Sequence, residues 1–294
     1  MEIQKIIDNL TTFDGKYKRD EIEEALSNRD EIIPALMEIL QKLLENPEKY
    51  SENSDYFGHI YAVMLLGHFK EKRAHEVILR LFSLQNDQPY RLFGDVVTEN
   101  LPVILLRTCD GNFEGIKKFI LNKEADEYCR GSGLRAMTYG VVDGSLPRDE
   151  VLLFFRNILE NRRSEQPSHF FDQMASCICD LFPQELMDLV KECYDDGYLH
   201  PGYIGLESFE SALKAGKETC LKNLQESLER DSLEDIHAAM SWWACFDEGG
   251  DYGDYLTQQN RLLSDELSKR ADKKKNKNKK KMIKSSKRKN RKRK

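Results

Sequence analysis

The sequence predicts an all-helical protein built from stacked helix pairs and followed by a disordered basic tail. Three observations support this prediction. Apolar residues recur at the spacing of one buried helix face, no run of alternating residues indicates a strand, and charge divides sharply between body and tail. The 294 residues, 40% hydrophobic and 33% charged, are enough for a sizeable core and are typical of a soluble protein.

Residues 1–50 are expected to form a helical N-terminal cap. Pro34 would lie in the first turn of its main helix, where a missing N–H is tolerated, and Pro47 would end that helix. The apolar face of this helix is formed by Ile32, Ile33, Leu36, Ile39, Leu40, Leu43 and Leu44.

Residues 51–246 are expected to form a HEAT-like helical repeat domain. The expected helix pairs are 56–70 with 73–84, 94–108 with 113–121, 127–142 with 148–159, and 170–181 with 184–193. Successive first helices begin about 33 to 43 residues apart, which is the period of α-solenoids with two helices per repeat. No such pair can bury its apolar face alone, so stacking would create one continuous core. Two or three further helices are expected over 203–246.

The C-terminal part divides into a breaker with a terminal helix at 247–268 and a disordered polybasic tail at 269–294. The tail carries 17 Lys and Arg residues and one acidic residue, Asp272. The other 268 residues carry 28 basic and 50 acidic side chains, a net charge of −22. The tail has too few apolar residues to offset the entropy lost on ordering.

The tail is the candidate polyanion-binding segment. A flexible strand with many cations can neutralise several phosphates of RNA, a ribosome or another polyanion, whatever the sequence bound. It contains no aromatic residue for base stacking. Docking of the tail on the acidic body and a nuclear-import-like role remain open alternatives. The candidate residues are Lys273, Lys274, Lys275, Lys279, Lys280, Lys281, Lys287, Arg288, Lys289, Arg291, Lys292, Arg293 and Lys294.

The acidic body is expected to present a groove to a basic or helical protein partner, formed by second helices and inter-helix turns. Two carboxylates four residues apart share a helix face, and adjacent tryptophans point about 100° apart, so one of them should be partly exposed. Tryptophan is common in binding hot spots. A solvated acidic face, or ion pairs to Arg91 or Arg135, is the alternative. The candidate residues are Asp95, Glu99, Asp110, Asp143, Trp242 and Trp243.

Several segments together are similar to a known family. They are 94–102, 125–130, 146–150, 179–186 and, most specifically, GYLHPGYIGLESFE at 197–210. These segments resemble an uncharacterised bacterial family of HEAT-like helical proteins, known only as a domain of unknown function, over about residues 55–246. The resemblance implies the fold and a bacterial origin, but no reaction. Members often end in a zinc-binding SEC-C motif, whereas here no cysteine follows Cys245 and lysine-rich sequence takes its place.

The cysteines favour a reducing, cytoplasmic environment, because their number is odd and their positions are scattered. They are Cys109, Cys129, Cys177, Cys179, Cys193, Cys220 and Cys245. The N-terminus lacks the apolar region of a signal peptide, and no apolar stretch is long enough to span a bilayer.

No catalytic residue, metal ligand or cofactor is predicted. The common nucleophile, phosphate-binding and zinc-protease motifs are absent. His75-Glu76 is the single His-Glu pair, whereas HEAT-like di-iron hydroxylases need several, and Cys177-Ile178-Cys179 lacks a second ligand pair. The sequence therefore favours a cytoplasmic, non-enzymatic interaction scaffold. A metal-dependent enzyme on a HEAT-like core and a bacterial effector with a nuclear-import-like tail remain the alternatives.

Overall fold

All regular structure in the described part of the chain is helical. The computed structural model describes residues 2–53 and 55–246, and within them a single isolated β-bridge joins Thr12 to Tyr56. The prediction of an all-helical body is confirmed. No helix in these ranges has the length and apolar character that crossing a bilayer would require. The predicted breaker, terminal helix and polybasic tail at 247–294 lie outside the described residues.

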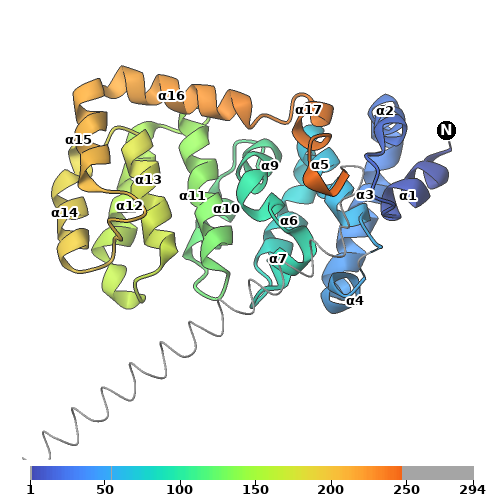
Figure 1. Cartoon of the computed structure of the whole chain (residues 1–294), viewed down its shortest axis with the longest axis horizontal. Helices are drawn as coiled ribbons and strands as arrows, with labels where there is room; N and C mark the ends of the chain where they lie inside the picture. The colour runs from blue at the N-terminus through green and yellow to red at the C-terminus, as the bar shows by residue number, and fades with distance from the viewer. Residues whose placement is uncertain (1, 54, 247–294) are drawn as a thin grey trace, which may run out of the picture.

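Helix pairs stack in one row along the molecule (Figure 1). The N-terminal helices are α1 (Ile3–Thr11), α2 (Arg19–Ser27), α3 (Arg29–Glu45) and α4 (Pro47–Ser51). The first helices of the pairs are α5 (Gly58–His68), α9 (Leu101–Thr108), α11 (Glu127–Val142) and α13 (His169–Asp180). The second helices are α6 (His75–Phe82), α10 (Glu114–Leu121), α12 (Arg148–Glu160) and α14 (Met187–Asp195). Two short helices, α7 (Gln88–Phe93) and α8 (Val96–Glu99), precede α9.

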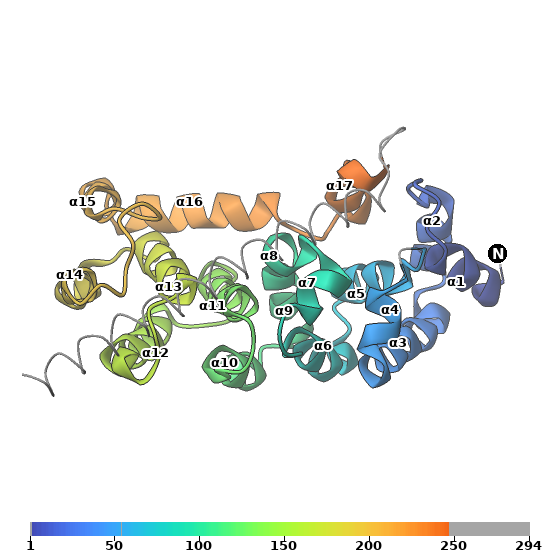
Figure 2. The same ribbon diagram turned by 60° about the horizontal axis from the view of Figure 1, so that its bottom comes forward.

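The first helices form one layer and the second helices another. Helix α5 packs between α3 and α9, and α11 packs between α9 and α13. Helix α6 contacts α10 and α12 contacts α14, so the second layer lies along the same side of the first (Figure 2). The side chains between the layers form one continuous apolar core from Ile6 to Cys245. Burial of this shared core is what holds the row together, since each pair offers only part of it.

Arginine side chains join the ends of neighbouring helices. The Arg107 guanidinium donates to the carbonyl oxygens of Gly67 and His68 at 2.8 and 2.7 Å. Arg130 donates to Ile120 at 2.7 Å, and Arg148 donates to Leu181 at 2.6 Å. These carbonyls lie at or near helix C-termini, where backbone acceptors have no partner within the helix. Each guanidinium therefore donates to acceptors at the end of another helix and fixes its position, and the Gly67 carbonyl also accepts from the Lys70 N–H.

The C-terminal part of the described chain doubles back along the row. After α15 (Leu206–Ala215), Gly216 adopts φ +87°, a left-handed conformation that favours glycine and allows the chain to reverse. Helix α16 (Lys217–Arg230) then crosses the first-helix layer against α13 and α11, and α17 (Ile236–Met240) packs on α5 (Figures 1 and 2). We call residues 217–246 the strap. It ends in a short 3₁₀ turn, Ala244–Phe246.

Specific contacts hold the strap in place. The Tyr139 hydroxyl donates to Asp231 at 2.5 Å. The His68 Nδ1 atom lies 2.7 Å from the carbonyl oxygen of Leu233, and the Leu233 side chain is fully buried. Glu234 accepts from Arg107 at 2.6 Å. The strap is therefore tied to α5, α9 and α11 by one polar contact each, with an apolar anchor between them.

Candidate partner-binding groove

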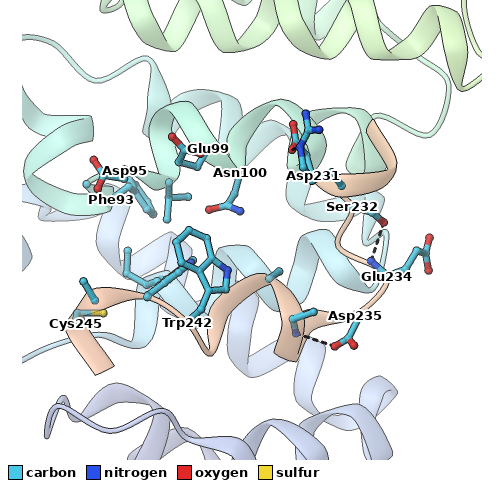
Figure 3. A pocket seen from close by; sticks show the side chains of 18 of the residues that line it. Phe93, Asp95, Glu99, Asn100, Asp231, Ser232, Glu234, Asp235, Trp242 and Cys245 are labelled. Atoms are coloured by element: carbon cyan, nitrogen blue, oxygen red, sulfur yellow. Dashed lines mark hydrogen bonds and ion pairs between the residues drawn. The ribbon is translucent and has the colours of Figure 1, made fainter. Parts of the chain in front are cut away.

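A hollow of about 870 Å³ lies between the strap and the short helices α7 and α8. We call it the Trp242 groove. Residues from 57 to 100 form one wall, and residues 229–245 of the strap form the other. Figure 3 shows Trp242 rising from the strap toward the wall that carries Phe93, Glu99 and Asn100. The groove exists because the strap crosses the row without filling the space beside α8.

The two adjacent tryptophans have different environments. Trp242 is 70% exposed, although it is the largest type of apolar side chain. Trp243 is partly buried and stacks nearly parallel on Phe246, with ring centroids 6.0 Å apart. Residues 241–243 form a turn after α17, so the two indoles diverge. One tryptophan thus anchors the strap, while the other is presented to solvent inside the groove.

Carboxylates dominate the polar lining of the groove. The acidic lining residues are Asp95, Glu99, Glu229, Asp231, Glu234 and Asp235, and the one basic lining residue among those described is Arg230. A hydrogen bond from Arg107 lowers the pKa of Glu234, and the Ala238 N–H lowers that of Asp235. Both groups therefore stay ionised at neutral pH. Arg107 and Lys70 offset the charge of Glu234, and the remaining carboxylates make the rim negative.

Aromatic and aliphatic side chains form the floor of the groove. Phe57, Ile60, Phe93 and Val96 line it and are buried. Phe93 stacks on Phe82 with centroids 4.4 Å apart, which ties the floor to the core. An apolar floor beneath a charged rim can receive a side chain that has an aliphatic stem and a charged head.

A second hollow of about 410 Å³ adjoins the groove along the strap. Glu229, Ser232 and Glu234 line both hollows. Asp110 and Asp143 line the second one, and Asp110 lies 3.1 Å from the Lys72 ammonium group. The Asp143 carboxylate accepts a hydrogen bond from the Ser145 hydroxyl.

The six residues that the sequence suggested for partner binding all line these two hollows, four in the groove and two in its neighbour. Their placement differs in one respect from the prediction. Asp95 is the N-cap of α8 and Glu99 is its last residue, and α8 leads into the first helix α9 rather than belonging to a second helix. Asn100 lies between α8 and α9, and Pro102 is in the first turn of α9. Arg135, considered as an ion-pair partner for them, lies 2.6 Å from Asp180.

Sequence analysis missed the acidic residues that the strap contributes. Glu229, Asp231, Glu234 and Asp235 are more than 120 residues away from Asp95 and Glu99 in the chain. Only the reversal at Gly216 brings the two sets together. The acidic run around 229–235 could have indicated a charged face, but nothing local indicated which helix it would face.

The sequence candidates for metal chemistry do not converge in the described residues. Among these residues no group of three or more His, Cys, Asp or Glu side chains is placed to hold a metal ion. Burial raises the pKa of the Cys177 thiol, and burial likewise raises that of Cys179 to about 12. His75 lies 2.9 Å from the Thr108 hydroxyl, and burial lowers its pKa to about 4. These thiols and this imidazole are neutral packing groups at pH 7.

His59, beneath the groove, makes stability depend on pH. Its Nε2 is hydrogen-bonded to the Leu92 carbonyl, so Nδ1 is the atom that would be protonated, and Nδ1 has no partner among the described residues. Burial lowers its pKa to about 4, against about 6.5 in an unfolded chain. The contribution of neutral His59 to the free energy of unfolding is fully present above pH 6.5 and is lost as pH falls towards 4. We expect a loss of roughly 3 kcal/mol in that window.

Urea denaturation of the wild type and of His59→Gln at pH 7, 6, 5 and 4 measures this effect. The wild type should lose stability more steeply than the variant, because only the wild type binds a proton on unfolding at position 59. Parallel curves for the two proteins would contradict this account of His59.

Comparison with known proteins gives a family and relatives. The family described as "Protein of unknown function (DUF1186)" matches residues 1–247. An uncharacterized protein of Chlamydia trachomatis is 30% identical over 239 residues, covering 80% of this chain and 95% of the relative. Another from Chlamydia muridarum is 29% identical over 244 residues, covering 83% and 97%. No solved structure matches. The matched range includes the whole Trp242 groove and excludes residues 248–294.

Proposed function

The chain belongs to the DUF1186 family, and from that premise we propose that it is a non-enzymatic interaction scaffold. The body binds a basic segment of a protein partner in the Trp242 groove. The polybasic tail contacts RNA or another polyanion. The observation that carries this proposal is an indole, 70% exposed, standing in a hollow whose rim is acidic.

The chemistry of the groove matches a lysine- or arginine-containing segment. The face of an exposed indole attracts a cation, and the attraction is worth about 0.5 to 1 kcal/mol at an exposed site. Carboxylates at Glu99, Glu229 and Asp235 would receive the charged head, while the apolar floor contacts the aliphatic stem. A hollow of about 870 Å³ holds a few side chains of a peptide. The negative rim also favours rapid encounter with a basic partner.

The acidic body suits a basic partner, and the basic tail suits a polyanion. Residues 1–268 carry a net charge of −22, which repels a polyanion, so phosphate contact falls to the 17 cationic residues of the tail. Binding by counterion release is independent of sequence and sensitive to salt. The scaffold would hold a basic protein partner near the polyanion.

Neutralising carboxylates of the groove tests whether the groove binds a basic peptide. The probe is a fluorescein-labelled, 15-residue amphipathic Lys/Leu peptide, whose affinity is measured by anisotropy at low salt. The triple variant Glu99→Gln, Glu229→Gln, Asp235→Asn should bind it at least about tenfold more weakly, at roughly 0.5 to 1 kcal/mol per exposed pair lost. Asn at position 235 can still cap α17, whose Ala238 N–H bonds to this side chain.

The matched control removes the same charge elsewhere. Glu124→Gln, Asp149→Asn and Asp188→Asn change three exposed carboxylates that line neither hollow. This control should bind the peptide like the wild type. Equal losses in the two triple variants would show that only net charge matters and would reject the groove as the site.

A further inference from the structure

We propose that the chain's own residues 269–294 occupy the Trp242 groove when no polyanion is bound. A polyanion that binds these lysines would then release the tail from the groove, and the protein partner could bind there. This inference rests on the proposed function and adds a regulatory link between its two halves. The tail would compete with the protein partner for the groove, and the polyanion would compete with the groove for the tail.

The end of the strap places the start of the undescribed segment at the groove. Cys245 lines the groove. Phe246 packs on Phe57, another lining residue, with centroids 5.7 Å apart, and on Trp243 at 6.0 Å. The described chain therefore ends one residue beyond the lining of the groove. Any segment that follows is tethered at this point.

The length of the connection makes docking feasible. Twenty-two residues separate Phe246 from Lys269. A connection of that length reaches about 33 Å even where every residue is helical, at about 1.5 Å per residue, and farther where it is extended. Such a tether gives an effective concentration on the order of millimolar. A weak contact between tail and groove would therefore be well populated, while the same contact between separate chains would not.

Charge and side-chain shape are complementary. Residues 269–294 carry a net charge of +16, and the groove is lined by six carboxylates, of which Glu234 is paired with Arg107 and Lys70 and Asp231 with Arg230. A lysine can lay its aliphatic stem on the exposed Trp242 ring and place its ammonium group among Glu99, Glu229 and Asp235. RNA phosphates compete for the same ammonium groups, because a lysine cannot pair with a carboxylate and a phosphate equally well at once.

Zero-length carbodiimide cross-linking of the full chain tests where the tail lies. At low salt we expect tail lysines to link to Glu99, Glu229 and Asp235 at least fivefold more often than to Glu124, Asp149 and Asp188. Added poly(U) RNA should remove the groove links. Mixing isotopically labelled and unlabelled chains identifies links within one molecule. Links spread evenly over the six carboxylates, links between chains only, or groove links that persist with RNA would overturn the proposal.

A second experiment uses the same peptide probe without RNA. The full chain in which Lys273, Lys274, Lys275, Lys279, Lys280 and Lys281 are replaced by Gln should bind the Lys/Leu peptide at least fivefold more tightly than the wild type. The control with Arg at these six positions should bind like the wild type. Equal peptide affinity in all three chains overturns self-docking but leaves the proposed function intact. If none binds the peptide, the proposed function fails, and the cross-links alone decide whether the tail docks.

Discussion

Replacing Arg130 by alanine is expected to lower the free energy of unfolding by about 3 to 5 kcal/mol. The Arg130 side chain is only 4% exposed. It donates to both carboxylate oxygens of Glu165, at 2.7 and 3.1 Å, and to the Ile120 carbonyl, and it lies 3.8 Å from the centroid of the Phe170 ring. The substitution would leave Glu165, which is 15% exposed, and the Ile120 carbonyl without this partner.

Arg163→Ala is the matched control. Arg163 is 79% exposed and pairs with Asp196 at 3.3 Å, so its loss should cost no more than about 0.5 kcal/mol. Urea denaturation followed by far-UV circular dichroism compares both variants with the wild type at pH 7. Similar, small losses in both would show that the buried guanidinium does not join α10 and α11 to the segment at Glu165.

Neutralising six tail lysines should lower the affinity for a polyanion by a large factor. With Gln at Lys273, Lys274, Lys275, Lys279, Lys280 and Lys281, the affinity for poly(U) should fall on the order of a thousandfold at low salt. The slope of log affinity against log salt should become shallower by about 4, at about 0.7 per phosphate contact for single strands. Filter binding at several salt concentrations measures both quantities.

The Arg-substituted chain separates charge from side-chain identity in this experiment. Six Lys→Arg changes at the same positions keep the charge and should preserve both affinity and slope. The unfolding midpoint should be nearly the same in all three chains, because none of the substitutions changes a residue of the described helices. RNA affinity that survives neutralisation would show that the body, and not the tail, binds the polyanion.

Local sequence signals located most of the helices. The helix expected at 127–142 has those bounds as α11, and the helix expected at 148–159 extends by one residue as α12. Helix α12 carries an apolar face and follows Pro147, whereas α11 is buried nearly all round but begins after the Asp126 cap and ends before Gly144. Neighbouring residues therefore decide the limits of both helices. The segment expected as one helix at 94–108 is divided into α8 and α9, because Pro102 occupies the first turn of a new helix.

The reversal of the strap could not be inferred from local signals. Helix α16 has 14 residues, of which only Cys220 and Leu224 are buried, so its apolar face is narrow and indicates no particular neighbour. Its place depends on contacts far away in sequence, such as Tyr139 with Asp231 and Arg107 with Glu234. The hydrogen bonds that arginine side chains make between helices likewise could not be inferred from local signals. The groove residues on α8 and at Trp242 were therefore predictable as candidates, but it was not predictable that they would line the same groove.

The emission of Trp242 tests the central claim that this groove binds lysine-rich segments. In the full chain with Trp243→Phe and the six tail lysines changed to Gln, Trp242 is the remaining tryptophan. Titration with unlabelled Lys/Leu peptide should shift its emission to shorter wavelength and saturate at the dissociation constant found by anisotropy. Emission that stays unchanged while anisotropy reports binding would place the peptide elsewhere and contradict the account.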